Sequence, residues 1–144
     1  MSDAVSTNQG RPTVLCIDDD RLVLGVCTTA LEAHGYRVVM ATNGRAGIAI
    51  AEKERPALIL LDIVMPGMDG FDVCRQLRAD PAFRHTPIVI MTAMNEPDLE
   101  AKGAEAGATL SIRKPFDPEQ VVSTVDQCLG KMGNSTRSRG DGEN

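Results

Sequence analysis

The stretch LILLDIVMPGMDG, residues 58–70, decides the fold and raises the first question about function. Four aliphatic residues run directly into the carboxylate of Asp62, and Pro66, Gly67 and Gly70 then mark a turn. An apolar run without alternation indicates a strand buried on both faces, as in a parallel sheet that helices cover on each side. Asp62 either caps the turn or is held at the strand end for chemistry, and the rest of the chain distinguishes the two.

The unit of a short apolar strand followed by a helix recurs along the chain. Short apolar segments alternate with segments whose apolar residues recur at helical spacing, such as Leu22, Val26 and Ala30 before Gly35. This alternation predicts an α/β fold with a doubly wound, five-stranded parallel sheet, in which ligands bind at the carboxyl ends of the strands. The predicted strands are residues 14–17, 37–41, 57–61, 87–91 and 109–112, and the predicted helices lie at about 22–34, 44–53, 71–78, 98–106 and 118–129.

The composition is that of one acidic globular domain. With 144 residues, 42% hydrophobic and 3% aromatic, the chain must build its core from aliphatic side chains. The net charge of -5 argues against nucleic acid as a direct partner, because duplex binding needs a basic face. The N-terminal residues have no secretory signal and no apolar run approaches the roughly 18 residues of a membrane span, so we expect a cytoplasmic protein without a membrane partner.

Polar residues at both ends set the expected domain limits. Residues 1–11 and 132–144 are rich in Ser, Asn, Gly and charged residues, which predicts flexible ends around one domain at 12–131. The cysteines form no C-x-x-C pair, so we expect buried, reduced thiols rather than a zinc or redox site. They are Cys16, Cys27, Cys74 and Cys128.

Acids, a hydroxyl and a cation follow four of the predicted strands. Taken singly, each has an ordinary interpretation: Asp20 as a helix N-cap, Thr92 as a hydroxyl bonded to backbone, and Lys114 as a surface lysine. Together they converge on the edge where this architecture places ligands, which favours a functional site. The residues are Asp18, Asp19 and Asp20 after the first strand, Asp62 after the third, Thr92 and Ala93 at the fourth, and Lys114 after the fifth.

The clustered carboxylates predict a bound cation. Two carboxylates about 4 Å apart repel by roughly 4 kcal/mol at an effective dielectric constant of 20, so they either take up a proton or bind a metal ion. Hard oxygen ligands without His or Cys favour Mg²⁺. A metal ion, a lysine and a hydroxyl together can neutralise the oxygens of a phosphoryl group, and a remaining carboxylate can act as the nucleophile.

Four segments of the chain resemble the receiver domains of two-component response regulators. They are VLCIDDD (14–20), LILLDIVMPGMDG (58–70), PIVIMTA (87–93) and GATLSIRKPF (107–116), which occur in this order within about residues 12–130. The resemblance implies a flavodoxin-like (βα)5 fold with the strand order 2-1-3-4-5. It also implies a phosphoacceptor that switches partner binding in a phosphorelay and is not an enzyme beyond slow self-dephosphorylation.

The resemblance implies a role for each site residue. Asp62 would accept a phosphoryl group from a sensor histidine kinase or a histidine phosphotransfer protein. Mg²⁺ would bind Asp19, Asp62 and the main-chain carbonyl of Val64, with Asp18 acting mostly through water. The remaining roles concern the phosphoryl oxygens: Lys114 would pair with one of them, Pro115 would follow a cis peptide that aims the lysine, and Thr92 with the Ala93 amide would move toward the phosphoryl group.

One position departs from the family pattern. Ser111 stands where the family usually carries an aromatic residue whose rotamer reports the position of the threonine. The output is therefore expected to run through the backbone of residues 95–106, where Pro97 and Gly103 predict an irregular helix. Val64 and Met94 flank the expected phosphoryl position and predict slow self-dephosphorylation.

Two other classes of protein share part of this pattern. A haloacid-dehalogenase-type phosphatase also uses a strand-end Asp and Mg²⁺ but needs a second Asp two residues later, where this chain has Val64. A flavin-phosphate binder needs a first loop rich in amide donors, whereas this loop is DDDR. Within the receiver class, the chain is either a stand-alone regulator or part of a longer one whose output domain is missing. Its downstream protein target is not predicted, and its partners could include a second phosphorylated copy.

Overall fold

The computed structural model describes residues 10–93 and 98–130. The chain folds into one parallel sheet of five strands in the order β2-β1-β3-β4-β5, which confirms the predicted fold class and strand order. Consecutive strands run in the same direction because each is joined to the next through a helix on one face of the sheet. The strands are β1 (Thr13–Ile17), β2 (Arg37–Ala41), β3 (Leu58–Asp62), β4 (Ile88–Thr92) and β5 (Leu110–Arg113).

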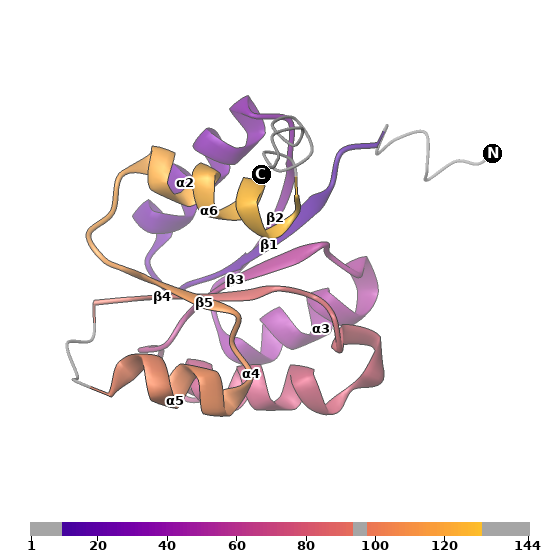
Figure 1. Ribbon diagram of the computed structural model, residues 1–144, viewed down its shortest axis with the longest axis vertical. Coiled ribbons are helices and arrows are strands. Elements are labelled where there is room, and N and C mark those ends of the chain that lie inside the picture. Colours follow the sequence, from indigo (N-terminus) through magenta and orange to yellow (C-terminus); the bar gives the residue numbers. More distant parts are fainter. Residues whose placement is uncertain (1–9, 94–97, 131–144) are drawn as a thin grey trace, which may run out of the picture.

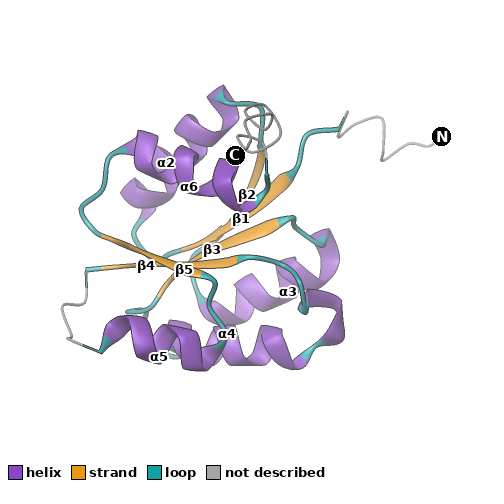
Figure 2. Cartoon of the chain, viewed as in Figure 1, coloured by secondary structure: helices purple, strands orange, loops and turns teal. Residues whose placement is uncertain are grey.

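Helices cover both faces of the sheet. In Figures 1 and 2, α2 and α6 lie on one face, and α3, α4 and α5 lie on the other. A short 3₁₀ turn, η1, lies between α4 and β4 and has no counterpart in the prediction. The helices are α2 (Arg21–Ala33), α3 (Gly44–Glu54), α4 (Gly70–Ala79), α5 (Leu99–Ala106) and α6 (Pro118–Cys128), and η1 is Pro81–Phe83.

The three central strands are buried along their whole length. Every residue of β1, β3 and β4 is buried, as the unbroken apolar runs predicted. Alternate side chains point to opposite faces, so Leu15 and Ile17 join the core under α3, α4 and α5, whereas Val14 and Cys16 join the core under α2 and α6. Two cores therefore hold the strands from both sides and fix the positions of their carboxyl ends.

The expectation for the cysteines needs one correction. All four are free, and Cys16, Cys27 and Cys74 are buried as predicted, but Cys128 is only half-buried. Cys128 is the last residue of α6, and its partly exposed side chain packs against the core under α2 and α6. Within the described ranges, no helix has the length and apolar character needed to span a bilayer.

A buried tyrosine joins the α2–β2 turn to α6. Tyr36 is fully buried, and its hydroxyl donates a hydrogen bond to the Asp126 carboxylate. Burial, and then this hydrogen bond, raise the pKa of Tyr36 far above its ordinary value. The raised pKa favours the protonated hydroxyl, which is the form that donates to Asp126 of α6.

Arg78 at the end of α4 ties three segments together. Its Nε donates to the carbonyl of Gly107 at 2.8 Å and its Nη1 donates to the carbonyl of Phe83 at 2.5 Å. Gly107 has a φ of 104°, and a Cβ there would lie 2.6 Å from Cγ of Arg78. The arginine therefore packs closely against the turn between α5 and β5.

We expect Arg78→Ala to lower the free energy of unfolding by about 2 kcal/mol, because two carbonyls lose a charged donor. Urea denaturation followed by circular dichroism measures the change. Arg75→Ala is the matched control on the same helix. Arg75 forms a surface ion pair with exposed Asp72, and such pairs contribute about 0.5 kcal/mol or less. Equal losses for the two variants would contradict the role of Arg78.

Candidate functional site

The predicted site residues meet at the carboxyl edge of the sheet. Asp18 directly follows β1, Asp62 is the last residue of β3 and Thr92 is the last residue of β4. Lys114 follows β5, and its N–H donates to the carbonyl of Thr92 at 2.9 Å. Asp62 pairs with Met91 in the sheet register, so the ends of β3 and β4 differ by only one residue.

Lys114 bridges two buried carboxylates. Its Nζ donates to Oδ2 of Asp18 at 2.7 Å and lies 3.6 Å from Oδ1 of Asp62. Asp18 is completely buried and Asp62 is 4% exposed. The other oxygen of Asp18, Oδ1, accepts the N–H of Asp20 at 2.9 Å. A cation and a backbone donor therefore compensate the burial of Asp18, whereas Asp62 lies farther from the ammonium group.

The first acidic turn also starts α2. Oδ1 of Asp20 accepts the N–H of Leu22 at 2.9 Å, so Asp20 is the N-cap of this helix, as predicted. Asp18 and Asp20 therefore have structural contacts of their own, whereas Asp19 between them is exposed.

The pKa of Asp62 is raised to about 6. Burial is the main cause, and the negative charge of Asp18 adds to it, whereas Lys114 and the N–H of Val64, which bonds to the carboxyl group, lower the pKa. Burial also lowers the pKa of Lys114, but the hydrogen bond and charge of Asp18 outweigh it and leave the pKa above its ordinary value. The raised pKa of Lys114 favours its cationic form, and burial favours the protonated form of Asp62 up to a higher pH than for an ordinary aspartate.

The three acids fit a hard divalent cation. One carboxylate oxygen from each of Asp18, Asp19 and Asp62 lies within 4.8 Å of the others. Oxygen ligands from two or three carboxylates, with room for water at the exposed Asp19, suit Mg²⁺. An ion there would also relieve the repulsion that raises the pKa of Asp62.

This titration gives a pH prediction for the chain without metal. Because the pKa of Asp62 is about 6 when folded and 3.8 ordinarily, the folded state holds a proton that the unfolded state loses between these values. The protonated Asp62 therefore contributes its full stability below about pH 3.8, and this contribution is lost as the pH rises through about 6. In EDTA we expect Asp62→Asn to match wild type near pH 4 and to exceed it by about 2–3 kcal/mol above pH 6. Urea denaturation across this pH range measures the difference in stability between the two chains. A difference that does not change with pH would contradict the raised pKa of Asp62. Added Mg²⁺ should make wild type the more stable chain, because Asn is a poor ligand for the ion.

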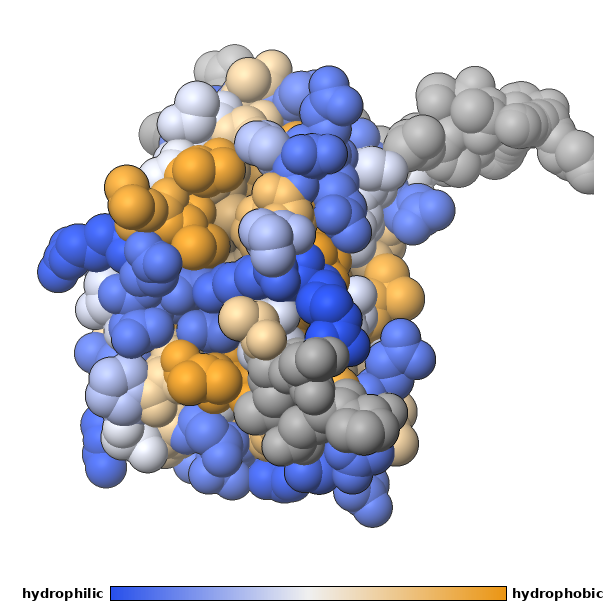
Figure 3. All heavy atoms as spheres, turned by 90° about the vertical axis from the view of Figure 1, so that its left-hand side faces the viewer, coloured by the Kyte–Doolittle hydropathy of each residue, from blue (hydrophilic) through white to orange (hydrophobic). Residues whose placement is uncertain are grey.

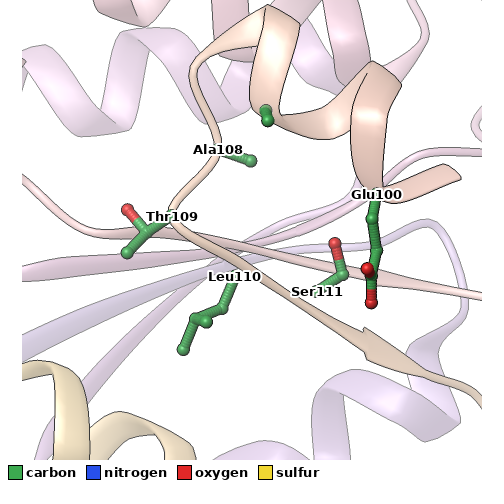
Figure 4. A pocket seen from close by; sticks show the side chains of 6 residues that line it. Glu100, Ala108, Thr109, Leu110 and Ser111 are labelled. Atoms are coloured by element: carbon green, nitrogen blue, oxygen red, sulfur yellow. The ribbon is translucent and has the colours of Figure 1, made fainter.

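Ser111, at the position of the missing aromatic residue, lines an open pocket between α5 and β5. Figure 4 shows its hydroxyl beside the Glu100 side chain at one end of the pocket, with Ala108 and Thr109 toward the other end. The pocket holds about 270 Å³ and its remaining lining residues are Ala104 and Leu110. The residues that line this pocket are small, polar or aliphatic, and none of them carries an aromatic ring.

The other predicted site residues are placed as follows. The Lys114–Pro115 peptide is cis. Ala93 is exposed after β4, and Val64 is 59% exposed after β3. Thr92 is completely buried. Met94, Asn95 and Pro97 lie outside the described residues; α5 is a short helix that begins after them, with Gly103 packed toward Ile90.

The structure adds an apolar groove beside the site. Leu22 is 80% exposed and Val26 is 42% exposed on α2, and both line a groove of about 390 Å³ that reaches Ala93 and Lys114. Figure 3, which faces the carboxyl edge, shows a hydrophobic patch in its upper half beside a hydrophilic band. The sequence pattern placed Leu22 and Val26 on a helix but could not show which apolar residues stay outside the core. The remaining lining residues are Val23, Pro115 and Phe116.

Comparisons with known proteins agree with this geometry. The family model of the response regulator receiver domain matches residues 14–126. Protein PilH of Pseudomonas aeruginosa is 36% identical over 116 residues, which are 81% of this chain and 96% of PilH. Response regulator PleD of Caulobacter vibrioides is 38% identical over 112 residues, 78% of this chain but 25% of PleD. The chain thus spans only a quarter of PleD. The crystal structure of chemotaxis protein CheY4 of Vibrio cholerae superposes with a TM-score of 0.80 at 32% identity, over 83% of this chain and 100% of that one.

Proposed function

Because the chain belongs to the response regulator receiver family, we propose that Asp62 accepts a phosphoryl group from a phosphorylated histidine and thereby changes which protein the domain binds. Receiver domains are signalling domains of two-component systems rather than classical enzymes. The surroundings of Asp62 support the proposal most directly. Its carboxylate lies at the end of a buried strand, 3.6 Å from Nζ of Lys114 and close to the carboxylates of Asp18 and Asp19.

The transfer exchanges one bond to phosphorus for another. A carboxylate oxygen of Asp62 attacks the phosphorus, the P–N bond to the donor histidine breaks, and the imidazole leaves with the electron pair. Mg²⁺, held by Asp19, Asp62 and the Val64 carbonyl with Asp18 acting through water, would supply positive charge to the phosphoryl oxygens. Lys114 stays cationic and is placed to bind one of these oxygens, because its Nζ already lies beside Asp62.

The new charge is proposed to act through Thr92. Phosphorylation adds a charge of about -1.5 to -2 and three acceptor oxygens at the end of β3. Thr92 ends the neighbouring strand, and its hydroxyl with the Ala93 amide would donate to the phosphoryl group. The position of the β4–α5 connection would then differ between the two states. With Ser111 in β5, this backbone movement rather than an aromatic rotamer would carry the signal to α5.

Intact mass tests the proposal directly. The chain is incubated with Mg²⁺ and acetyl phosphate, and we expect the mass of one phosphoryl group to be added. Asp62→Asn and a sample in EDTA should show no addition. Addition to Asp62→Asn would place the acceptor elsewhere, and no addition to a folded wild type, from either acetyl phosphate or a phosphorylated histidine kinase, would overturn the proposal.

The donor is proposed to dock on the apolar groove of α2. Leu22 and Val26 are exposed apolar side chains next to Lys114, so a protein seated on them would bring its phosphohistidine to Asp62. A sensor histidine kinase or a histidine phosphotransfer protein is such a donor. The downstream partner would be a protein that recognises the phosphorylated state, and a second phosphorylated copy is one such partner.

The phosphoryl group is proposed to be lost slowly. Val64 follows the acceptor by two residues and is 59% exposed, so an apolar side chain stands at the opening of the site and hinders attacking water. We also propose that the domain acts as a stand-alone regulator in the cytoplasm. Its coverage of 96% of PilH and of the whole CheY4 chain supports this role.

A further inference from the structure

Gly70, the first residue of α4, lies against the main chain at the end of β3. A Cβ atom at this position would lie 2.3 Å from the carbonyl oxygen of Asp62 and 2.7 Å from Cα of Ile63. Both distances are too short for real Cβ atoms, and both partners are backbone atoms that no side-chain rotation can move away. The N–H of Gly70 also donates to the carbonyl of Ile63 at 2.8 Å. The start of α4 is therefore in direct contact with the peptide that carries Asp62.

The contact explains why the position needs glycine. Gly67 in the same loop has a φ of 84°, which favours glycine for its backbone conformation, and a Cβ there would meet nothing within 4 Å. Gly70 has no positive φ, so its backbone suits any residue. Glycine is needed at position 70 because the backbone of Asp62 and Ile63 occupies the place that a Cβ atom would take.

Ile63 connects the contact at Gly70 to the proposed Mg²⁺ site. Ile63 precedes Val64, whose N–H bonds to the Asp62 carboxyl group. Val64 also carries the carbonyl proposed as a ligand of Mg²⁺. A shift of Ile63 would therefore turn both the donor that orients Asp62 and a proposed ligand of the ion.

We infer that Gly70 is a positioning residue of the Mg²⁺ and phosphoryl site: its missing side chain lets α4 hold the backbone of Asp62–Val64 in the orientation that binds the ion. The inference rests on the proposed function for the ligand set. Outer contacts that orient metal ligands typically change metal affinity by about 10–100-fold when removed. We therefore expect Gly70→Ala to weaken Mg²⁺ binding at least roughly tenfold.

Gly44→Ala is the matched control. Gly44 is also the first residue of a helix, α3, behind an Asx N-cap. Its added Cβ would lie 2.7 Å from Cγ2 of Val73 and 3.2 Å from Sδ of Met68, so it clashes with side chains and not with the backbone at Asp62. Gly44→Ala should lose stability but keep the Mg²⁺ affinity of wild type. Gly25 lies inside α2, and nothing lies within 4 Å of the added Cβ, so Gly25→Ala should keep the Mg²⁺ affinity and gain some stability from the better helix propensity of Ala.

Mg²⁺ affinity is measured by isothermal titration calorimetry at low temperature with an osmolyte, after circular dichroism has shown each variant to be folded. Wild-type affinity for Gly70→Ala, or the same loss for Gly44→Ala, would overturn the inference. If Gly70→Ala does not fold, Phe71→Leu is compared with Val73→Ala. Both trim a buried residue of α4, but Phe71 lines a cavity together with Ile63 and Val64, whereas Val73 does not. Only Phe71→Leu should therefore weaken Mg²⁺ binding, and equal affinities would overturn the inference.

The same titration separates this inference from the proposed function. A wild-type chain that binds Mg²⁺ but takes no phosphoryl group from acetyl phosphate or a kinase would overturn the proposed function alone. A wild-type chain that binds no Mg²⁺ would overturn the positioning role. The comparison of Gly70→Ala with Gly44→Ala therefore uses the affinity for Mg²⁺ and does not depend on phosphorylation.

Discussion

Lys114→Ala should slow phosphorylation of Asp62 by acetyl phosphate by a factor of roughly 10²–10³, the usual loss when one fixed donor to developing negative charge is removed. The Nζ of Lys114 lies 3.6 Å from Oδ1 of Asp62, so the ammonium group is placed to bind an oxygen of the incoming phosphoryl group. The variant should also lose stability in EDTA, because buried Asp18 loses the ammonium group that compensates it. Rates of mass increase under excess Mg²⁺ measure the first effect.

Lys53→Ala is the control for this experiment. Lys53 is an exposed lysine in the last turn of α3, so the variant has the same change of net charge without a change at the site. It should phosphorylate at the wild-type rate. A wild-type rate for Lys114→Ala as well, with Mg²⁺ binding intact, would show that the lysine does not contact the phosphoryl group.

Leu22→Asp should reduce transfer from a phosphorylated histidine protein by at least about tenfold, as expected for an apolar anchor at the centre of an interface. Transfer from acetyl phosphate should not change, because Leu22 is 80% exposed and its side chain takes no part in the pairing of Lys114 with Asp62. The measurement uses a purified histidine kinase or phosphotransfer protein that loads the wild type. The ratio of the transfer rate from the histidine protein to the rate from acetyl phosphate then separates an effect on docking from an effect on the chemical step.

The chain supplies a matched control for docking. Leu110 in β5 is also an exposed leucine, at 43%, but it lines the pocket beside Ser111 and not the groove of α2. Leu110→Asp should leave transfer from the histidine donor unchanged. Equal losses in the two leucine variants would mean that the donor does not dock specifically on α2.

The residues at the carboxyl edge of the sheet could be predicted because each of them directly follows its strand in the sequence. Each central strand is an unbroken apolar run, and the polar residue that ends it is adjacent in sequence, as with Ile17 and Asp18 or Leu61 and Asp62. A parallel sheet then brings these ends together whatever the details of the helices. The strand that carries Asp62 differs from the prediction only in including that residue and beginning one residue later.

The contacts within the site could not be predicted, because they depend on distances across the fold. The sequence does not show that Lys114 bonds to Asp18 at 2.7 Å and lies farther, at 3.6 Å, from Asp62. Nor does it distinguish the steric need at Gly70 from the conformational need at Gly67, since both are glycines in one turn. The exposure of Leu22 likewise follows from which face of α2 the sheet covers.

The buried tyrosine also makes the chain suitable for spectroscopy. Tyr36 is the only tyrosine and the chain has no tryptophan, so near-ultraviolet absorption beyond that of phenylalanine comes from one side chain. That side chain bonds to Asp126, which means that its circular dichroism reports whether α6 is docked on the sheet. A single tryptophan introduced at an exposed position near Asp62 would then report the site without competing signals, and the two probes would separate local rearrangement from loss of the C-terminal helix.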